Sequence, residues 1–247
     1  MKYLTVSDTH GRNSWERAIF EKEHNSNTIL QCYIGKRFDK VVFLGDYVDS
    51  YDKTNEEILT NLKNIIDLKK QYPNDVILLL GNHDFAYLYN ERCSGYRPEM
   101  DMDIVELLNK NINLFKIAYQ DKNVIFVHAG ITKGWYNYHM LPIIEGKKET
   151  RYTPYLILCD NIADQLNLMF EFNEPILRMC GRDRGGIDRV GGPLWVDKEN
   201  LYKKPIEGFH QIVGHTAIDR IKVYDFKNNT KLTFTDCANK EFYYINV

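Results

Sequence analysis

The most regular feature of the sequence is a series of short, mainly apolar runs, each of which ends abruptly in polar residues. Five such runs lie at residues 3–6, 41–44, 76–80, 124–127 and 211–213, and clusters of Asp, Asn, His, Gly or Thr follow them. Continuous apolar runs of this length are typical of strands that are buried on both faces. We therefore predict an α/β protein whose sheets are covered on both sides.

Helical patterns lie between these strands. Thr54 and Glu57 have the spacing of a capping box, and apolar residues then recur on one helical face until Pro73. Two further helices are predicted at 101–110 and 154–172. Strands that alternate with helices in this way favour sheets with helical layers packed on them.

The last part of the chain changes period and predicts successive strands, at 222–226, 231–235 and 241–247. The least patterned segment, 131–192, is expected to form a helical insertion or cap over the site. No repeat, low-complexity tract or interdomain linker interrupts the chain, so residues 1–247 are expected to form a single domain. The sequence pattern therefore predicts mixed sheets flanked by helices.

The composition narrows the class of protein without indicating an activity. The 247 residues include 32 Lys and Arg against 34 Asp and Glu, a formal net charge of −2, which argues against a surface that coats nucleic acid. The five cysteines contain no C-x-x-C pair, so neither a disulfide framework nor a thiolate zinc site is indicated. The chain start turns polar too early for a signal peptide, and no apolar run is long enough to span a membrane. We therefore expect a cytoplasmic protein with no membrane partner.

The polar clusters after the strands contain the residue types that bind metal ions. In open α/β sheets, ligands bind beyond the carboxyl ends of the strands. Six candidate ligands follow the five runs, namely Asp8, His10, Asp46, Asn82, His128 and His215. Nitrogen and oxygen donors without thiolate suit Mn²⁺, Fe or Zn²⁺. Taken singly, each motif is more often a turn or a hydrogen-bonded buried histidine than a metal ligand, but five of them in one chain predict a metal site.

The number of candidate ligands indicates two divalent ions. Six protein ligands exceed what one catalytic ion with an open position needs, so two ions that share a carboxylate are the more economical arrangement. Asp46 is the expected bridge, because it lies between the Asp8 and His10 pair and the later candidates along the chain.

The same ordered motifs resemble the calcineurin-like metallophosphoesterase superfamily. The resemblance rests on Asp8-x-His10, Gly45-Asp46-x-x-Asp49, Gly81-Asn82-His83-Asp84, His128-Ala129-Gly130 and Gly214-His215-Thr216. It implies a four-layer α/β/β/α sandwich of mixed sheets with two metal ions at the sheet edge. By motif position, it also implies that Asp8 and His10 bind the first ion and that Asp46 bridges. The second ion would then be bound by Asn82, His128 and His215.

Two features are similar to the phosphoprotein phosphatase (Ser/Thr phosphatase-like) branch and its diadenosine-tetraphosphatase relatives. Ala217 stands where many nuclease-like members have a second His, and the segment 192–195 reads Gly-Pro-Leu-Trp. One departure concerns substrate binding, because Ser50 stands where this branch has the Arg that holds the substrate phosphate. Arg184 and Arg97 are the candidates to replace it, with Arg12 a further possibility. A solvated, internally paired loop is the alternative interpretation for each arginine.

The resemblance also implies a catalytic pair. His83 is placed to give a proton to the leaving group, and Asp49 to orient it and to sustain its charged form. The alternative is a structural hydrogen bond between these two side chains. We therefore predict a binuclear metal-dependent phosphoesterase that hydrolyses phosphomonoesters, with Ser/Thr phosphoproteins as the leading substrate class.

Three other functions remain as alternatives. The first is hydrolysis of nucleotides or dinucleoside polyphosphates. The second is a non-catalytic scaffold of the same fold, which is disfavoured because every candidate ligand and His83 are present. The third is nuclease action, which Ala217 and the lack of net basic charge disfavour. A phosphorylated substrate is the expected partner in the leading interpretation.

Overall fold

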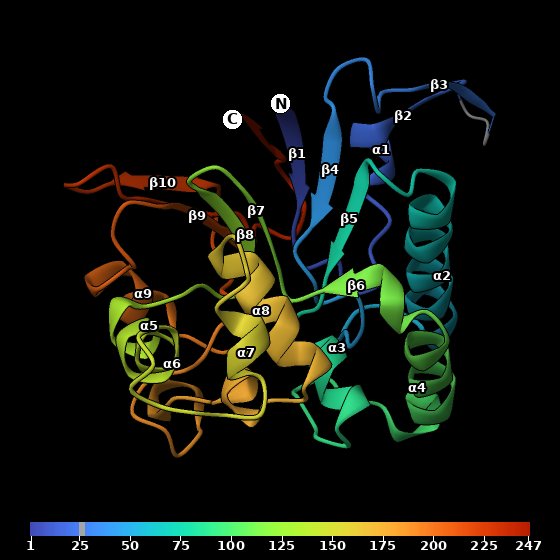
Figure 1. Ribbon diagram of the computed structural model, residues 1–247. Coiled ribbons are helices and arrows are strands. Elements are labelled where there is room, and N and C mark those ends of the chain that lie inside the picture. The colour runs from blue at the N-terminus through green and yellow to red at the C-terminus, as the bar shows by residue number, and fades with distance from the viewer. Residues whose placement is uncertain (25–27) are drawn as a thin grey trace.

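The computed structural model describes residues 1–24 and 28–247, and its centre consists of two five-stranded sheets (Figure 1). The first sheet has the order β12-β1-β4-β5-β6, formed by Tyr243–Asn246, Lys2–Val6, Lys40–Phe43, Val76–Leu79 and Phe115–Lys116. The second has the order β10-β11-β9-β8-β7, formed by Lys222–Asp225, Lys231–Phe234, His210–Val213, Val124–Val127 and Ala118–Asp121. A separate hairpin joins β2 (Phe20–Lys22) to β3 (Ile29–Cys32).

Both sheets are mixed, as predicted. In the first sheet β1, β4, β5 and β6 are parallel, and β12 adds antiparallel to β1 at the edge. In the second sheet β8, β9 and β11 are parallel, with antiparallel strands at both edges. The carboxyl ends of the parallel strands therefore meet on one edge of each sheet, where the polar clusters follow.

Alternate side chains of the strands build two separate parts of the core. Tyr3, Val42, Leu44, Ile77 and Leu79 of the first sheet pack with Val124, Phe126 and Ile212 of the second, so the sheets face each other. The opposite faces bury a second set of side chains against the helices, including Ile58 and Leu62 of α2, Ile104 and Leu108 of α4, and Leu166 and Met169 of α8. Because both faces of the strands are buried, the apolar runs show no alternation in the sequence.

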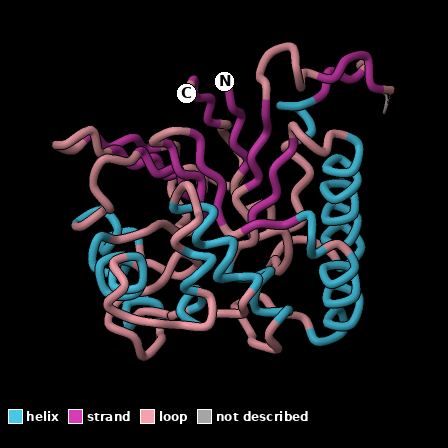
Figure 2. Tube along the Cα trace, in the orientation of Figure 1, coloured by secondary structure: helices cyan, strands magenta, loops and turns pink. Residues whose placement is uncertain are grey.

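The helices lie around the paired sheets, and loops connect the two kinds of element (Figure 2). The longer ones are α2 (Asn55–Gln71), α4 (Asp101–Lys110) and α8 (Ile162–Glu171). The shorter ones are α1 (Glu16–Ile19), α3 (Asn82–Leu88), α5 (Lys133–His139), α6 (Leu141–Ile144), α7 (Thr153–Leu156) and α9 (Lys198–Lys203). Single 3₁₀ turns occur at Pro98–Met100, Ile112–Leu114, Pro175–Arg178 and Arg182–Arg184. Among the described helices, none is long and apolar enough to cross a membrane.

The capping box predicted for α2 is present, because the Glu57 N–H donates to Thr54 Oγ1 and the Thr54 N–H donates to the Glu57 carboxylate.

The prediction of a single helix at 154–172 is wrong, since the chain forms α7 and α8 with a break at 157–161. The break has a local cause: Asn161 Oδ1 accepts the Asp164 N–H at 2.9 Å and starts α8 as a new helix.

Much of the segment 131–192 is helical, and α8 packs on β7. This part of the segment therefore contributes to the outer helical layer on the second sheet. Its last part, around the 3₁₀ turn Arg182–Arg184, returns to the strand-end edge, where Arg184 hydrogen-bonds Thr216. That this segment forms a cap over bound substrate stays a prediction.

Candidate metal centre and active site

The residues that follow the strands adopt an unusual backbone conformation. Asp8, His10, Asp46, Asp49 and His215 all have positive φ values, between 39° and 66°. Residues other than glycine are strained there by about 1–3 kcal/mol each, and such residues persist where the surrounding structure holds them. The structure thus holds five of the residues that the sequence singled out for chemistry in strained backbone conformations.

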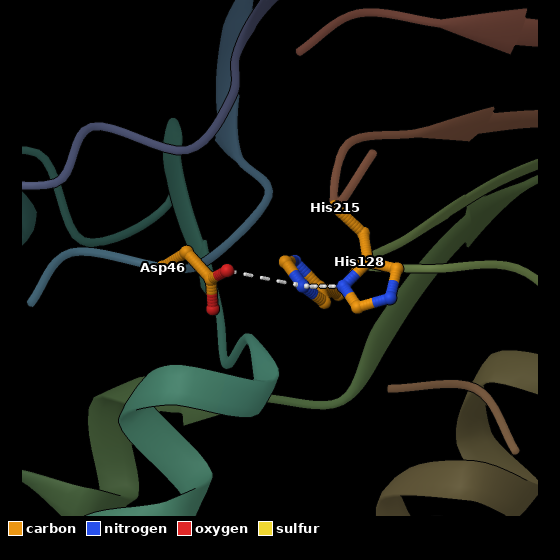
Figure 3. Close-up of side chains that lie close together, drawn as sticks. All are labelled: Asp46, His128 and His215. Carbon is orange, nitrogen blue, oxygen red and sulfur yellow. Dashed lines mark hydrogen bonds and ion pairs between the residues drawn. The ribbon is translucent and has the colours of Figure 1, made fainter. Parts of the chain in front are cut away.

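Donor atoms from four of these motifs converge at one point between the two sheets. Ligand atoms of Asp46, His128 and His215 all lie within 4.8 Å of one another (Figure 3). The Asn82 Oδ1 atom lies 2.8 Å from His128 Nε2 and 2.7 Å from His215 Nδ1. These side chains come from the ends of β4, β8 and β9 and from the start of α3. They therefore form one cluster of oxygen and nitrogen donors.

A second cluster shares Asp46 with the first. Ligand atoms of Asp8, His10 and Asp46 also lie within 4.8 Å of one another. Backbone N–H groups orient the two carboxylates, because His215 N donates to Asp8 Oδ1 at 2.9 Å and His83 N donates to Asp46 Oδ1 at 3.0 Å. The tertiary structure thus brings all six predicted ligands together in two adjoining groups with Asp46 in common.

For two of the imidazoles, second contacts fix which nitrogen faces the cluster. His128 Nδ1 lies 2.8 Å from the Leu44 carbonyl oxygen, which can only accept, so this nitrogen carries the proton. His10 Nδ1 lies 2.8 Å from the carbonyl oxygens of Val48 and Asp49 and is fixed in the same way. The Nε2 atoms of both rings therefore present lone pairs to the clusters, as metal-binding histidines do.

The electrostatics of the cluster match those of a cation site. Burial acts to raise the pKa of Asp46, but the surrounding imidazoles outweigh it and hold that pKa below the usual range. Burial and the nearby carboxylates of Asp236 and Asp46 raise the pKa of Asp8. Burial lowers the pKa of His128 and of His215, which keeps both imidazoles neutral. Neutral imidazoles and crowded carboxylates are the forms that bind divalent ions, so these residues fit the metal site.

The predicted pair of His83 and Asp49 is in contact beside the clusters. His83 Nδ1 lies 2.8 Å from Asp49 Oδ2, and Tyr87 Oη donates to the other carboxylate oxygen at 2.6 Å. Burial disfavours the charged imidazole, but the carboxylates of Asp46 and Asp49 raise the pKa of His83 to about 9. The raised pKa favours the protonated imidazole at neutral pH, and the Asp49 carboxylate that contacts it is itself held by Tyr87. Sequence reasoning missed Tyr87, although it lies four residues after His83, on the same face of α3.

A second buried carboxylate fixes the loop that carries Asp46. Asp84 is fully buried, and its two oxygens accept the N–H groups of Asp46, Tyr47 and Gly81 at 2.7–2.9 Å. Gly81 is required beside it, because a Cβ at this position would clash with the Asp46 carboxylate. The sequence did not indicate a role for Asp84, because the three N–H groups that donate to it follow two different strands, β4 and β5.

The two candidate arginines lie in different surroundings. Arg184 hydrogen-bonds Thr216 Oγ1, and its Nε lies 3.0 Å from Asp197 Oδ2. Its charge also contributes to the lowered pKa of His215, after burial and His128. Arg97 instead donates to the carbonyl oxygens of Ser50 and Lys53 at 2.7 and 2.6 Å and to Asn55 Oδ1 at 2.5 Å. Arg97 therefore holds the turn that follows Asp49.

Arg12, the further possibility, lies near the other half of the clusters. Its Nη2 atom donates to Asp52 Oδ1 at 2.6 Å, and Ser50 Oγ donates to the same oxygen at 2.9 Å. Ser50, which stands where the resemblance predicts an arginine, thus hydrogen-bonds the nearby Asp52. Arg12 is partly exposed, with 28% of its side-chain surface accessible.

Comparisons with known proteins agree with this geometry. The family model for calcineurin-like phosphoesterases matches residues 1–221, from the first strand to beyond His215. A cold-active protein-tyrosine phosphatase of a psychrophilic Shewanella species aligns with a TM-score of 0.55 and 16% identity, over 96% of this chain and 71% of that chain. Another structure of a cold-active protein tyrosine phosphatase gives 0.54 and 16%, over 96% and 70%. At 16% identity, these structural likenesses show a shared fold. The search of curated proteins found no match to the sequence.

The fold, the strand-end motifs and the family match lead to the same assignment. The predicted sandwich of mixed sheets flanked by helices is confirmed, and its shared edge holds Asp and His groups that are able to bind metal. The family match spans most of the chain and includes all of the motifs. The chain belongs to the calcineurin-like phosphoesterase family and is a metal-dependent phosphoesterase.

Proposed function

We propose that this phosphoesterase hydrolyses phosphomonoesters at a centre of two divalent ions, with Ser/Thr phosphoproteins as the leading substrate class. One observation carries the proposal: two groups of ligand atoms share Asp46 and lie beside the paired His83 and Asp49. In the proposal Asp8 and His10 hold the first ion, and Asp46 belongs to both. Asn82, His128 and His215 hold the second ion.

The donor set supports Mn²⁺, Fe or Zn²⁺ as the resident ions, because it combines imidazole nitrogens with hard oxygens and contains no thiolate. When bound, such ions polarise the phosphoryl group and lower the pKa of water that attacks it. The protein contributes the orientation of the ligands. The carbonyl oxygens of Leu44 and Val48 fix two imidazoles, and backbone N–H groups fix the carboxylates of Asp8 and Asp46.

His83 is the proposed proton donor to the leaving oxygen. Its Nδ1 is occupied by Asp49 at 2.8 Å, so Nε2 is the nitrogen that is free to donate, and it lies 4.0 Å from Asp46 Oδ2 at the edge of the clusters. Asp49 acts as a positioning residue, because its negative charge sustains the imidazolium while Tyr87 fixes the carboxylate. This division of roles is typical of carboxylate–histidine pairs in acid–base catalysis.

Arg184 is the proposed phosphate-binding arginine. It is the candidate whose charge acts on His215, and Asp197 and Thr216 hold it from two sides. A guanidinium fixed in this way loses little freedom when it pairs with a phosphate, and its planar fork suits two phosphate oxygens. The guanidinium of Arg97 already makes three contacts to the protein. We therefore propose that Arg97 stabilises the 50–55 turn and does not bind phosphate.

The proposed function is tested by turnover of a substrate panel after reconstitution with Mn²⁺, Fe²⁺ or Zn²⁺. The panel contains an aryl phosphate, phosphoserine and phosphotyrosine peptides, mononucleotides, a dinucleoside tetraphosphate and a cyclic nucleotide. We expect hydrolysis of the monoesters, with kcat/KM highest for the phosphoserine peptide. The phosphotyrosine peptide is included because the structural neighbours are named tyrosine phosphatases. Preference for the dinucleoside tetraphosphate would contradict the proposal and indicate a dinucleoside polyphosphate hydrolase. Binding of metal without turnover of any substrate would indicate a non-catalytic scaffold.

The proposed role of Arg184 predicts a split between kinetic constants. Arg184→Gln removes the charge but keeps a polar side chain near Thr216. We expect kcat/KM for a phosphomonoester to fall about 10–100-fold, because a hydrogen bond to a charged group contributes ~1.5–3 kcal/mol. The loss should appear mainly in KM. The exposed Arg220→Gln is the matched control and should leave both constants unchanged. An unchanged KM for Arg184→Gln would remove this residue from the phosphate site.

A further inference from the structure

The turn that carries two ligands of the first group has a strained backbone. Asp8 and His10 lie on either side of Thr9, and their φ values are 39° and 44°. Residues other than glycine keep such conformations only where the surrounding structure holds them. One restraint comes from the segment after β4, because the His10 N–H donates to the Asp46 carbonyl oxygen at 2.9 Å. A second restraint acts on the Thr9 side chain, between the two strained residues.

Helix α2 holds Thr9 through a buried amide. Asn61 Nδ2 donates to Thr9 Oγ1 at 3.2 Å, and Asn61 Oδ1 accepts the Trp15 Nε1–H at 2.9 Å. The indole nitrogen can only donate, so it fixes which end of the amide faces Thr9. The exposed fraction is 1% for Thr9 and 2% for both Asn61 and Trp15. A buried chain of hydrogen bonds therefore links α2 to the turn between Asp8 and His10.

The face of α2 that contains Asn61 is otherwise apolar. Asn61 is the single polar residue that this helix buries, and the others are Ile58, Leu62, Ile65, Ile66 and Leu68. A buried amide costs free energy unless its partners satisfy it, so an apolar residue is the ordinary choice at such a position. Ile58, one turn before Asn61, packs on the same loop, since a Cβ at Gly11 would lie 2.7 Å from Ile58 Cγ1. Helix α2 thus contacts the loop at two points, and Asn61 makes the polar contact.

The contacts of α2 are specific to the first group of ligands. Among the residues that the structure describes, no hydrogen bond joins α2 to Asn82, His128 or His215. His128 is oriented instead by the Leu44 carbonyl oxygen, at 2.8 Å. A change at Asn61 should therefore act on one group of ligands and spare the other.

We propose that Asn61 is a positioning residue for the first ion, because it holds the turn in which Asp8 and His10 face Asp46. The inference rests on the metal centre of the proposed function. Asn61 acts through Thr9, since Thr9 and Trp15 engage the two ends of its amide. Without this donor the strained turn is free to relax, and the ligands of the first group lose their alignment. Removal of a partner behind a metal ligand commonly weakens metal binding about 10–100-fold.

The test is titration of the metal-free protein with Mn²⁺, followed by calorimetry. His10→Asn and His128→Asn identify the two classes of site, because each removes a ligand of one group only. We expect Asn61→Leu and Thr9→Val to weaken the class that His10→Asn removes by about 10–100-fold and to leave the other class unchanged. Thr9→Ser keeps the hydroxyl and should bind Mn²⁺ as the wild type does. Asn64→Leu, at an exposed position of α2, is the matched control and should also match the wild type.

A second comparison separates positioning from a purely structural role. Ile65→Val shortens a buried side chain on the same helix, so it should lower the thermal midpoint of the metal-free protein and leave both classes of site intact. If Asn61→Leu lowers the midpoint in the same way without changing the isotherm, Asn61 is only structural and the proposal is wrong. Equal weakening of both classes would also overturn it.

Two further outcomes are covered by the same set of variants. If Asn61→Leu does not fold, the pair Thr9→Val and Thr9→Ser decides, and identical isotherms for these two would count against the proposal. Two bound ions with no turnover of any phosphomonoester would reject the proposed function while leaving this inference intact.

Discussion

Asp46→Asn is expected to lose one or both bound divalent ions and to lower kcat/KM by about 1,000-fold or more, because ~4 kcal/mol of metal-dependent stabilisation corresponds to about three factors of ten. The reason is its position, since Asp46 is the one carboxylate that both groups of ligand atoms contain. Its Oδ1 also accepts the His83 N–H, so the change disturbs the link between the centre and the proposed proton donor. Asparagine is the sharpest replacement, because it matches the shape of Asp and tolerates the φ of 55° at this position.

The measurement for Asp46→Asn is metal content by elemental analysis together with turnover of an aryl phosphate. The matched control is Asp219→Asn, an exposed acidic residue on the loop beyond β9, which should retain both ions and full activity. Unfolding by denaturant in the absence of metal shows whether the chain remains folded. A variant that keeps two ions and wild-type activity would refute the shared role of Asp46.

His83→Asn should separate substrates by their leaving groups. We expect kcat to fall by about 100–10,000-fold for a phosphoserine peptide, whose alkoxide leaving group needs a proton, which is the range for loss of a general acid. An activated aryl phosphate expels a stable anion and should lose far less. The geometry supports this difference, because Asp49 occupies Nδ1 and leaves Nε2 to donate, and nearby carboxylates raise the pKa of His83 to about 9. The protonated form that would donate is therefore the form favoured at neutral pH.

Two controls sharpen the experiment on His83. Asp49→Asn removes the charge that sustains the imidazolium and should reproduce part of the same leaving-group dependence. His139→Asn replaces a histidine that packs on Trp135 and Tyr138, outside the site, and should leave both substrates unaffected. Equal losses on the phosphoserine peptide and the aryl phosphate would remove His83 as the proton donor. They would instead indicate a structural hydrogen bond with Asp49.

The arginines show where sequence reasoning reached its limit. Arg97 and Arg184 both follow motif segments and are equally plausible phosphate ligands in the sequence. In the structure Arg97 closes the turn after Asp49, whereas Arg184 reaches Thr216 beside His215. A long, flexible side chain takes its direction from partners that are distant in sequence, and Asp197 and Thr216 are not signalled by any spacing around Arg184.

Residues to which the sequence assigned no role illustrate the same limit. Asp84 and Tyr87 contact residues of the centre from α3, because Asp84 accepts the Asp46 N–H and Tyr87 donates to the Asp49 carboxylate. Tyr87 had a local signal, which is its spacing of four residues from His83 on α3. The break between α7 and α8 was equally hidden, because Asn161 is an ordinary polar residue in the sequence until its side chain caps a helix.

The sequence by itself determined the strands, the helix cap at Thr54 and the set of six candidate metal ligands. It determined them because burial on both faces removes polar residues from strands, so the polar side chains needed for chemistry gather at the strand ends. The tertiary structure alone decided which donors meet, which imidazole nitrogens are free and where the arginines point. Those properties depend on atoms brought together from distant segments, such as His215 N on Asp8, at distances that spacing along the chain does not encode.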